Sequence, residues 1–83
     1  MGGCQTQEQK VERLIKQLRD QNLDVRRDSV WALGKIGSEA KDAVPDLIPL
    51  LKDPEVVYRA EEALKSIGIP EALEAVEEYQ SQQ

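Results

Sequence analysis

The stretch LDVRRDSVWALGKIGSEAKDAVPDLIPLLKDPE, residues 23–55, carries most of the information about the fold. At 100° per residue, the small and apolar residues of its first half share one stripe of a helix: Val25, Ser29, Ala32, Leu33 and Ile36. Asp24 is a suitable N-cap, and Gly37 stands where a left-handed C-cap is expected. We therefore predict a helix from Asp24 to Ile36 that buries one face.

The second half of this stretch predicts another helix of a different character. Residues 38–42 form a connector, and Pro45 suits a first helical turn, where its missing N–H is not needed. Pro49 falls inside the helix expected over residues 44–52. It should kink or loosen the last turn, because it removes one backbone hydrogen bond.

Three more helices are predicted on either side of this stretch. One covers residues 7–20, a second starts at Asp53 and Pro54 and ends at Gly68, and a third covers residues 70–79. The apolar residues of the last helix are all expected to face the interior: Ala72, Leu73, Val76 and Tyr79. The chain is thus expected to contain five helices joined by short connectors.

An internal repeat relates these helices in pairs. The first and third align with an offset of 33 residues, and the residues that correspond are Val11, Leu14, Ile15 and Leu18 with Val44, Leu47, Ile48 and Leu51. The second and fourth align with an offset of 31 residues, and the residues that correspond are Val25, Ser29, Ala32, Leu33, Ile36 and Gly37 with Val56, Ala60, Ala63, Leu64, Ile67 and Gly68. Two similar helical hairpins are therefore expected to stack on each other.

The length of 83 residues leaves room for one small domain. We expect a disordered or anchoring tail over residues 1–7 and a single all-α domain over residues 8–80. Within this domain, repeat one covers 8–37, repeat two covers 38–68 and a capping helix covers 69–80. Because the connectors are short, neighbouring helices should pack antiparallel, which gives an α-α solenoid of about two and a half repeats.

The patterns DVRRxxxxALGxIG and AVPxLIxLLKD resemble HEAT repeats, in particular the short type of phycobilin lyase-like HEAT proteins and many bacterial scaffolds. The resemblance covers about residues 10–68. It implies a right-handed, armadillo-like superhelix in which the second helix of each pair lines the concave side. The chain departs from the pattern at Ser29, at Val57 and Tyr58, and by a two-residue deletion in the second repeat. These departures concern the regularity of the second unit rather than the architecture.

Composition excludes several classes of function. The net charge is −5, with eight Lys or Arg and six Asp or Glu in residues 1–41, against three and ten in residues 42–83. Nucleic-acid binding is not expected of such an acidic chain, because neutralisation of phosphates dominates that binding. The chain has no His and one Cys, so it lacks the commonest general base, a structural zinc site and an internal disulfide.

We therefore expect a protein that is not an enzyme and that uses no metal and no cofactor. The clustered carboxylates of the second half are expected to form a solvated face: Glu61, Glu62, Glu71, Glu74, Glu77 and Glu78. The serines have no base to activate them. No run of about 18 apolar residues that could span a bilayer occurs in the sequence.

Trp31 is the strongest candidate for a binding residue, because it lies opposite the inward stripe of its helix. Tyr58 aligns with Arg27 one repeat earlier and should lie beside Trp31 on the concave surface. The remaining residues of this predicted partner-binding patch are Arg26, Arg27, Val30, Val57, Glu61 and Glu62. In the alternative interpretation, Trp31 folds over Val30 or Tyr58 as local packing. Gly34, on the same side, either admits the close approach of a neighbour or has no present role.

The segment MGGCQT leaves three interpretations open. Gly3 and Cys4 resemble the end of a bacterial lipobox, which would make Cys4 the lipidated residue of a membrane-anchored lipoprotein if a signal segment precedes it. The same segment fits N-myristoylation at Gly2, with Cys4 available for a second chain. In the third interpretation the tail is unmodified, and the protein is cytoplasmic if Met1 is the native start.

The function predicted from the sequence is a non-enzymatic adaptor or assembly factor. It would bind another protein through the concave surface of its second and fourth helices. An accessory subunit or relic of a phycobilin lyase-like complex, contributing a wall of a shared bilin site, is one alternative, which rests on the resemblance alone. A homodimer formed through the same patch is the other.

Overall fold

The computed structural model describes residues 6–83, and every element within this range is helical. Four elements are α-helices of eleven residues or more: α1 (Gln7–Gln17), α2 (Leu23–Ile36), α4 (Val57–Ile67) and α5 (Pro70–Ser81). Between α2 and α4 lie three short elements: the 3-10 helix η1 (Gly37–Ala43), the single turn α3 (Val44–Leu47) and the 3-10 helix η2 (Ile48–Lys52). The all-α fold class is confirmed.

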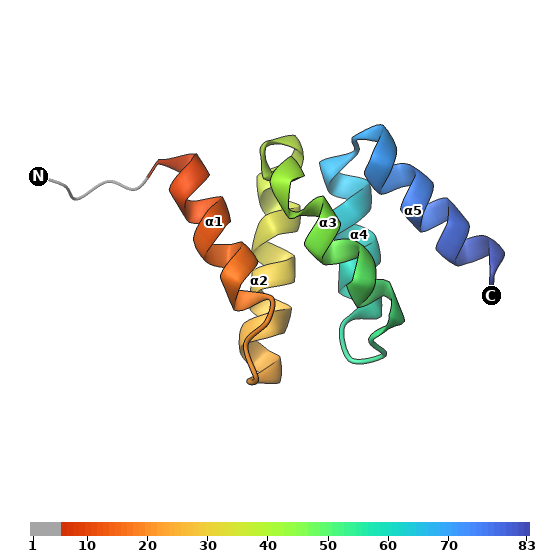
Figure 1. Cartoon of the computed structure of the whole chain (residues 1–83), viewed down its shortest axis with the longest axis horizontal. Coiled ribbons are helices and arrows are strands. Elements are labelled where there is room, and N and C mark those ends of the chain that lie inside the picture. Colours follow the sequence, from red (N-terminus) through yellow and green to blue (C-terminus); the bar gives the residue numbers. More distant parts are fainter. Residues whose placement is uncertain (1–5) are drawn as a thin grey trace, which may run out of the picture.

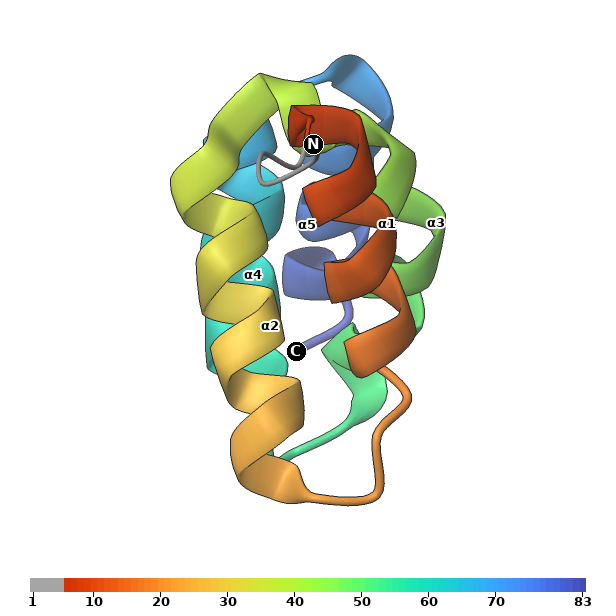
Figure 2. The same ribbon diagram turned by 90° about the vertical axis from the view of Figure 1, so that its left-hand side faces the viewer.

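The helices form two layers along an elongated molecule of 49 × 28 × 16 Å. Figure 2 shows α2 and α4 together on one side, with α1 and α3 on the other side. The contact between α2 and α4 is the most extensive of any two elements. Helix α5 follows at the far end of the stack, where it packs on α4 and η2 (Figure 1). No helix within residues 6–83 is long and apolar enough to cross a membrane.

The core repeats with the sequence. In the outer layer the same three positions of each unit are buried: Val11, Leu14 and Leu18, and then Val44, Leu47 and Leu51. The fourth position, Ile15 and Ile48, is half-buried in both units and packs against the core. In the inner layer Leu33 and Leu64 are both fully buried. The stack of two equivalent hairpins predicted from the sequence is therefore confirmed.

The third predicted helix is not one regular helix. Instead of an α-helix over 44–52, the chain forms the single turn α3 and continues as η2. Pro49 sits at the start of η2 and has no N–H for an α-helical bond, so the tighter 3-10 geometry takes over. The connector predicted over 38–42 is also helical and belongs to η1.

Two predicted helix starts were wrong. Asn22, and not Asp24, is the N-cap of α2, and its side-chain oxygen accepts a hydrogen bond of 2.8 Å from the Asp24 backbone N–H. Helix α4 begins at Val57, because the Asp53 carboxylate accepts from the Glu55 backbone N–H at 2.9 Å and forms a local turn before the helix.

The two helix-ending glycines differ. Gly68 has φ 74° and ψ 4° and forms a left-handed C-cap at the residue where the sequence predicted the end of the helix. Gly37 also has a positive φ of 81°, but its ψ is −143°, so the prediction of a left-handed cap was wrong there. Backbone of this kind is nearly restricted to glycine, and it leads the chain directly into η1.

Leu73 does not face the interior as predicted, since 41% of its surface is exposed. Helix α5 touches the rest of the molecule along one stripe, in which Ala72 and Val76 are buried and Ala75 and Tyr79 pack against the core. Leu73 follows Ala72 by 100° around the helix and falls outside this stripe. Cys4 and Gly2, the predicted sites of lipidation, lie outside the described residues.

Candidate functional site

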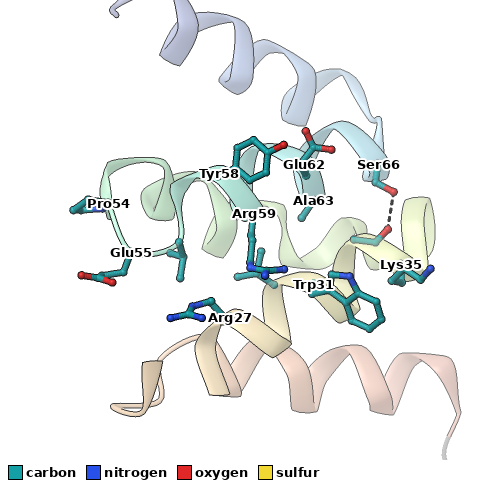
Figure 3. Close-up of a pocket in the computed structure, with 13 residues that line it drawn as sticks. Arg27, Trp31, Lys35, Pro54, Glu55, Tyr58, Arg59, Glu62, Ala63 and Ser66 are labelled. Atoms are coloured by element: carbon teal, nitrogen blue, oxygen red, sulfur yellow. Dashed lines mark hydrogen bonds between the residues drawn. The ribbon is translucent and has the colours of Figure 1, made fainter. Parts of the chain in front are cut away.

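The site begins with a close contact between α2 and α4. A Cβ atom placed on Gly34 would lie 3.2 Å from the Cα atom of Ala63, so only glycine fits at this distance without a shift of the neighbouring backbone. The Ser66 hydroxyl donates a hydrogen bond of 2.6 Å to the Gly34 carbonyl, drawn as a dashed line in Figure 3. Gly34 therefore admits a neighbouring helix, as one interpretation of the sequence predicted.

Beside this contact lies an open hollow of about 630 Å³ between the two helices, which we call the α2–α4 groove. It is lined by Arg27, Val30, Trp31, Gly34, Lys35, Pro54, Glu55, Val56, Tyr58, Arg59, Glu62, Ala63 and Ser66. Its floor is apolar, because Val30, Val56 and Ala63 are almost completely buried. Its rim consists of long aromatic and charged side chains.

Two aromatic side chains stand on this rim. Trp31, on α2, is 56% exposed, and Tyr58, on α4, is 72% exposed. The Lys35 ammonium lies 5.4 Å from the centre of the Trp31 ring, a cation–π contact between residues one helical turn apart. The Trp31 ring is therefore positioned at the surface rather than packed away in the interior.

In the part of the chain that the structure describes, the charged groups of the groove form no salt bridges with one another. The groove contains three cations, Arg27, Lys35 and Arg59, and two carboxylates, Glu55 and Glu62. Within residues 6–83 the one salt bridge joins groups outside the groove, the Arg19 guanidinium and the Asp46 carboxylate at 3.1 Å.

Five of the eight predicted patch residues line the groove: Arg27, Val30, Trp31, Tyr58 and Glu62. The prediction that Val30 is an exposed patch residue was wrong, because its side chain is fully buried and forms part of the groove floor. It is buried because α2 packs on both sides, against α1 and against α4, so its buried arc is wider than one narrow stripe.

Three predicted residues lie elsewhere. Arg26 donates hydrogen bonds of 2.7 and 3.0 Å to the backbone carbonyls of Asp20 and Gln21, and so ties α2 to the connection from α1. Val57 packs against the core and borders a different hollow, beside α5. Glu61 accepts a hydrogen bond of 3.0 Å from the Gln80 side chain on α5.

Several groove residues were missed, above all Lys35 and Arg59. The sequence does contain a signal for those on α4, because Val56, Arg59, Ala63 and Ser66 follow one another at spacings of three, four and three residues. Such spacing marks one face of a helix, and this is the face that meets α2. Among residues 6–83, no group of three or more His, Cys, Asp or Glu is placed to hold a metal ion.

Stacked helical hairpins whose inner helices lie side by side define the chain as an α-α solenoid. The family model of HEAT repeats matches residues 8–82, and the chain belongs to this family. HEAT repeats are generally protein–protein interaction modules. No curated protein and no solved structure matches the chain significantly.

Proposed function

We propose that the chain is a non-enzymatic adaptor that binds a partner protein in the α2–α4 groove. One observation carries the proposal: of the three large hydrophobic side chains exposed within residues 6–83, two stand on the rim of the same groove. They are Trp31 and Tyr58, and aromatic residues of these types dominate the binding energy of protein interfaces. The third, Leu73, lies on α5, outside the groove.

The rigidity of the groove supports the same proposal. The helices that form it are held by the contact of Gly34 with Ala63 and by the hydrogen bond from Ser66. The Trp31 ring is further restrained by Lys35. A partner would meet a surface that is already formed, so less of the binding energy is lost in ordering it.

The proposal is tested by capture of partners from native extract of the source cells on the immobilised protein. Trp31→Ala and Tyr58→Ala should each reduce the captured amount about tenfold or more, because truncation of a central aromatic costs about 2 kcal/mol. Leu73→Ala is the matched control, since it removes an exposed hydrophobic side chain outside the groove. Circular dichroism melts establish that the variants are folded.

If the two aromatic variants capture the same proteins as the unchanged chain, the groove is not the binding surface. Equal losses in all three variants would also contradict the proposal, since the effect would then not be specific to the groove.

Two alternatives for the same groove have direct tests. Self-association through Trp31 and Tyr58 predicts a dimer in sedimentation velocity at micromolar concentration, and a monomer for the Trp31→Ala variant. The finer resemblance to phycobilin lyase-like proteins suggests a bilin in the groove, whose volume of about 630 Å³ is in the range of small-molecule sites. Incubation with bilin and apo-phycobiliprotein, followed by absorbance spectra, distinguishes this alternative.

A further inference from the structure

Two arginines from different helices face the α2–α4 groove. Arg59 extends from α4 towards α2, and Arg27 lies on α2 at the same hollow (Figure 3). Within residues 6–83 neither guanidinium takes part in a hydrogen bond or a salt bridge. A guanidinium offers five donors in a planar fork that matches a carboxylate, and the bidentate pair is among the strongest charged hydrogen bonds. The groove therefore presents two such forks that have no acceptor among residues 6–83.

The groove has three cations against the two carboxylates of Glu55 and Glu62, and this excess of one positive charge is local. The whole chain has a net charge of −5, and its second half carries ten acidic residues against three basic ones. Arg59 belongs to that acidic half, yet Figure 3 shows its guanidinium directed towards α2 while the Glu62 carboxylate is directed away from it, towards the α5 side. A partner with negative charge would thus be attracted at this hollow and repelled by the acidic second half of the chain.

An apolar surface adjoins the two cations. Trp31 is 56% exposed, and the floor beside it is formed by Val56 and Ala63. The Lys35 ammonium contacts the ring and holds it in place. An apolar side chain of a partner could be buried there, next to the carboxylates that the arginines bind.

The length of the groove limits the size of the segment that it takes. The residues of α2 that line the groove run from Arg27 to Lys35, and at 1.5 Å per residue they span about 12 Å. An extended chain rises about 3.3 Å per residue, so about four residues would follow the groove from end to end.

We propose that the α2–α4 groove binds an extended acidic segment of a partner protein, about four residues long. Its carboxylates pair with Arg27 and Arg59, and an apolar side chain between them lies on Trp31. This inference rests on the proposed function and specifies the chemistry of the partner. Charge complementarity favours this occupant over a second copy packed groove to groove, an arrangement that would bring the same cations against each other.

The first test is a selection from random hexapeptides displayed on phage, with the complete chain as bait. Peptides enriched in Asp and Glu with one large apolar residue are expected. The Arg27→Ala, Arg59→Ala double variant should lose this enrichment, whereas Arg13→Ala, an exposed arginine on α1, should keep it. Selection of neutral or basic peptides, no selection at all, or acidic enrichment that survives the double variant would each overturn the inference.

The second test measures affinity with one selected acidic peptide. Trp31 is the only tryptophan, so its fluorescence reports directly on the groove. Affinity is expected to fall about tenfold in each single arginine variant and to weaken steadily with added salt. The same peptide with Gln and Asn in place of its acids should bind about tenfold more weakly. Equal binding of the amide peptide, or of a single-stranded RNA hexamer, would refute recognition of carboxylates.

Failure of this inference can be told apart from failure of the proposed function. If capture from extract depends on Trp31 and Tyr58 but survives both arginine substitutions and competition by the acidic peptide, the groove binds a partner of other chemistry. If capture does not depend on Trp31 and Tyr58, the groove function itself is wrong.

Discussion

The face that α2 turns towards α4 and the corresponding face of α4 occupy equivalent positions in the two repeats but have opposite character. On α2, Val30 is fully buried, and Gly34 lets the two helices approach closely. The offset of 31 residues places Glu61 and Lys65 at the same two positions of α4. Glu61 accepts a hydrogen bond from the Gln80 side chain of α5, and Lys65 is exposed. Two positions per inner helix thus decide whether another inner helix can pack there.

This difference between the two faces explains why, within residues 6–83, a groove between two inner helices forms at one place, between α2 and α4. A further inner helix could not pack on α4 as α4 packs on α2, because Lys65 stands where a glycine would be needed. Glu61 would also lose its water and leave a charge buried without a cation. The tilted α5 covers α4 instead: it packs on α4 and η2, and its Gln80 side chain donates a hydrogen bond to Glu61 (Figure 1).

Replacing Val30 with glutamate, the residue at the equivalent position of α4, should cause the largest loss of stability among the variants that compare the two faces. Val30→Glu would bury a carboxylate between α2 and α4, and we expect a loss of about 3–5 kcal/mol in the free energy of unfolding, enough to unfold a domain of this size. The measurement is urea denaturation followed by circular dichroism. The reciprocal change, Glu61→Val, should alter the free energy by less than about 1 kcal/mol, because this side chain is only partly buried. Similar losses in both variants would show that the two faces are equivalent after all.

A larger side chain at Gly34 should lower the stability of the protein through its size rather than through a charge. Gly34→Leu is expected to cost about 1–3 kcal/mol, because its first carbon would already lie 3.2 Å from the Ala63 backbone. The same leucine at the matching position, Lys65→Leu, should change the free energy by less than about 0.5 kcal/mol. Thermal melts of both variants, measured side by side, give the comparison. A stable Gly34→Leu variant would mean that α2 and α4 are held less closely than the structure shows.

The smallest effect is expected at Ser66. Ser66→Ala removes the hydroxyl that donates to the Gly34 carbonyl, and a loss of about 0.5–1.5 kcal/mol should follow. Ser38→Ala serves as control, because this exposed serine has no side-chain hydrogen bond within residues 6–83. Chemical denaturation resolves such a difference when both variants are measured together. An unchanged midpoint for Ser66→Ala would indicate that water replaces the bond without cost.

The layers of the fold could be predicted because burial repeats with the sequence. The offsets of 33 and 31 residues identify Leu14 with Leu47 and Leu33 with Leu64, and each of these side chains is buried. Local details were less predictable, since they depend on competition between neighbouring groups. Asn22 displaced Asp24 as N-cap, and the turn formed by Asp53 delayed the start of α4.

The groove was only partly predictable for a geometric reason. Trp31 was found because it stands opposite the buried stripe of its helix, and Tyr58 because it aligns with Arg27 one repeat earlier. A single helix, however, does not reveal which flank meets its neighbour, so Val30 was placed on the surface and Glu61 in the groove. The close contact of Gly34 on α2 with Ala63 on α4 determines that flank, and with it the position of Arg59.

The linear order of the stack has a consequence for its motions. Helices α2 and α4 have neighbours on both sides, whereas α1 and α5 stand at the two ends and have neighbours on one side (Figure 1). In such arrays each unit is stabilised mainly by those next to it. Amide protons of α2 and α4 should therefore exchange with solvent most slowly, while those of the end helices exchange through partial opening. The groove lies between the two most protected helices, so the ends can fray without disturbing it.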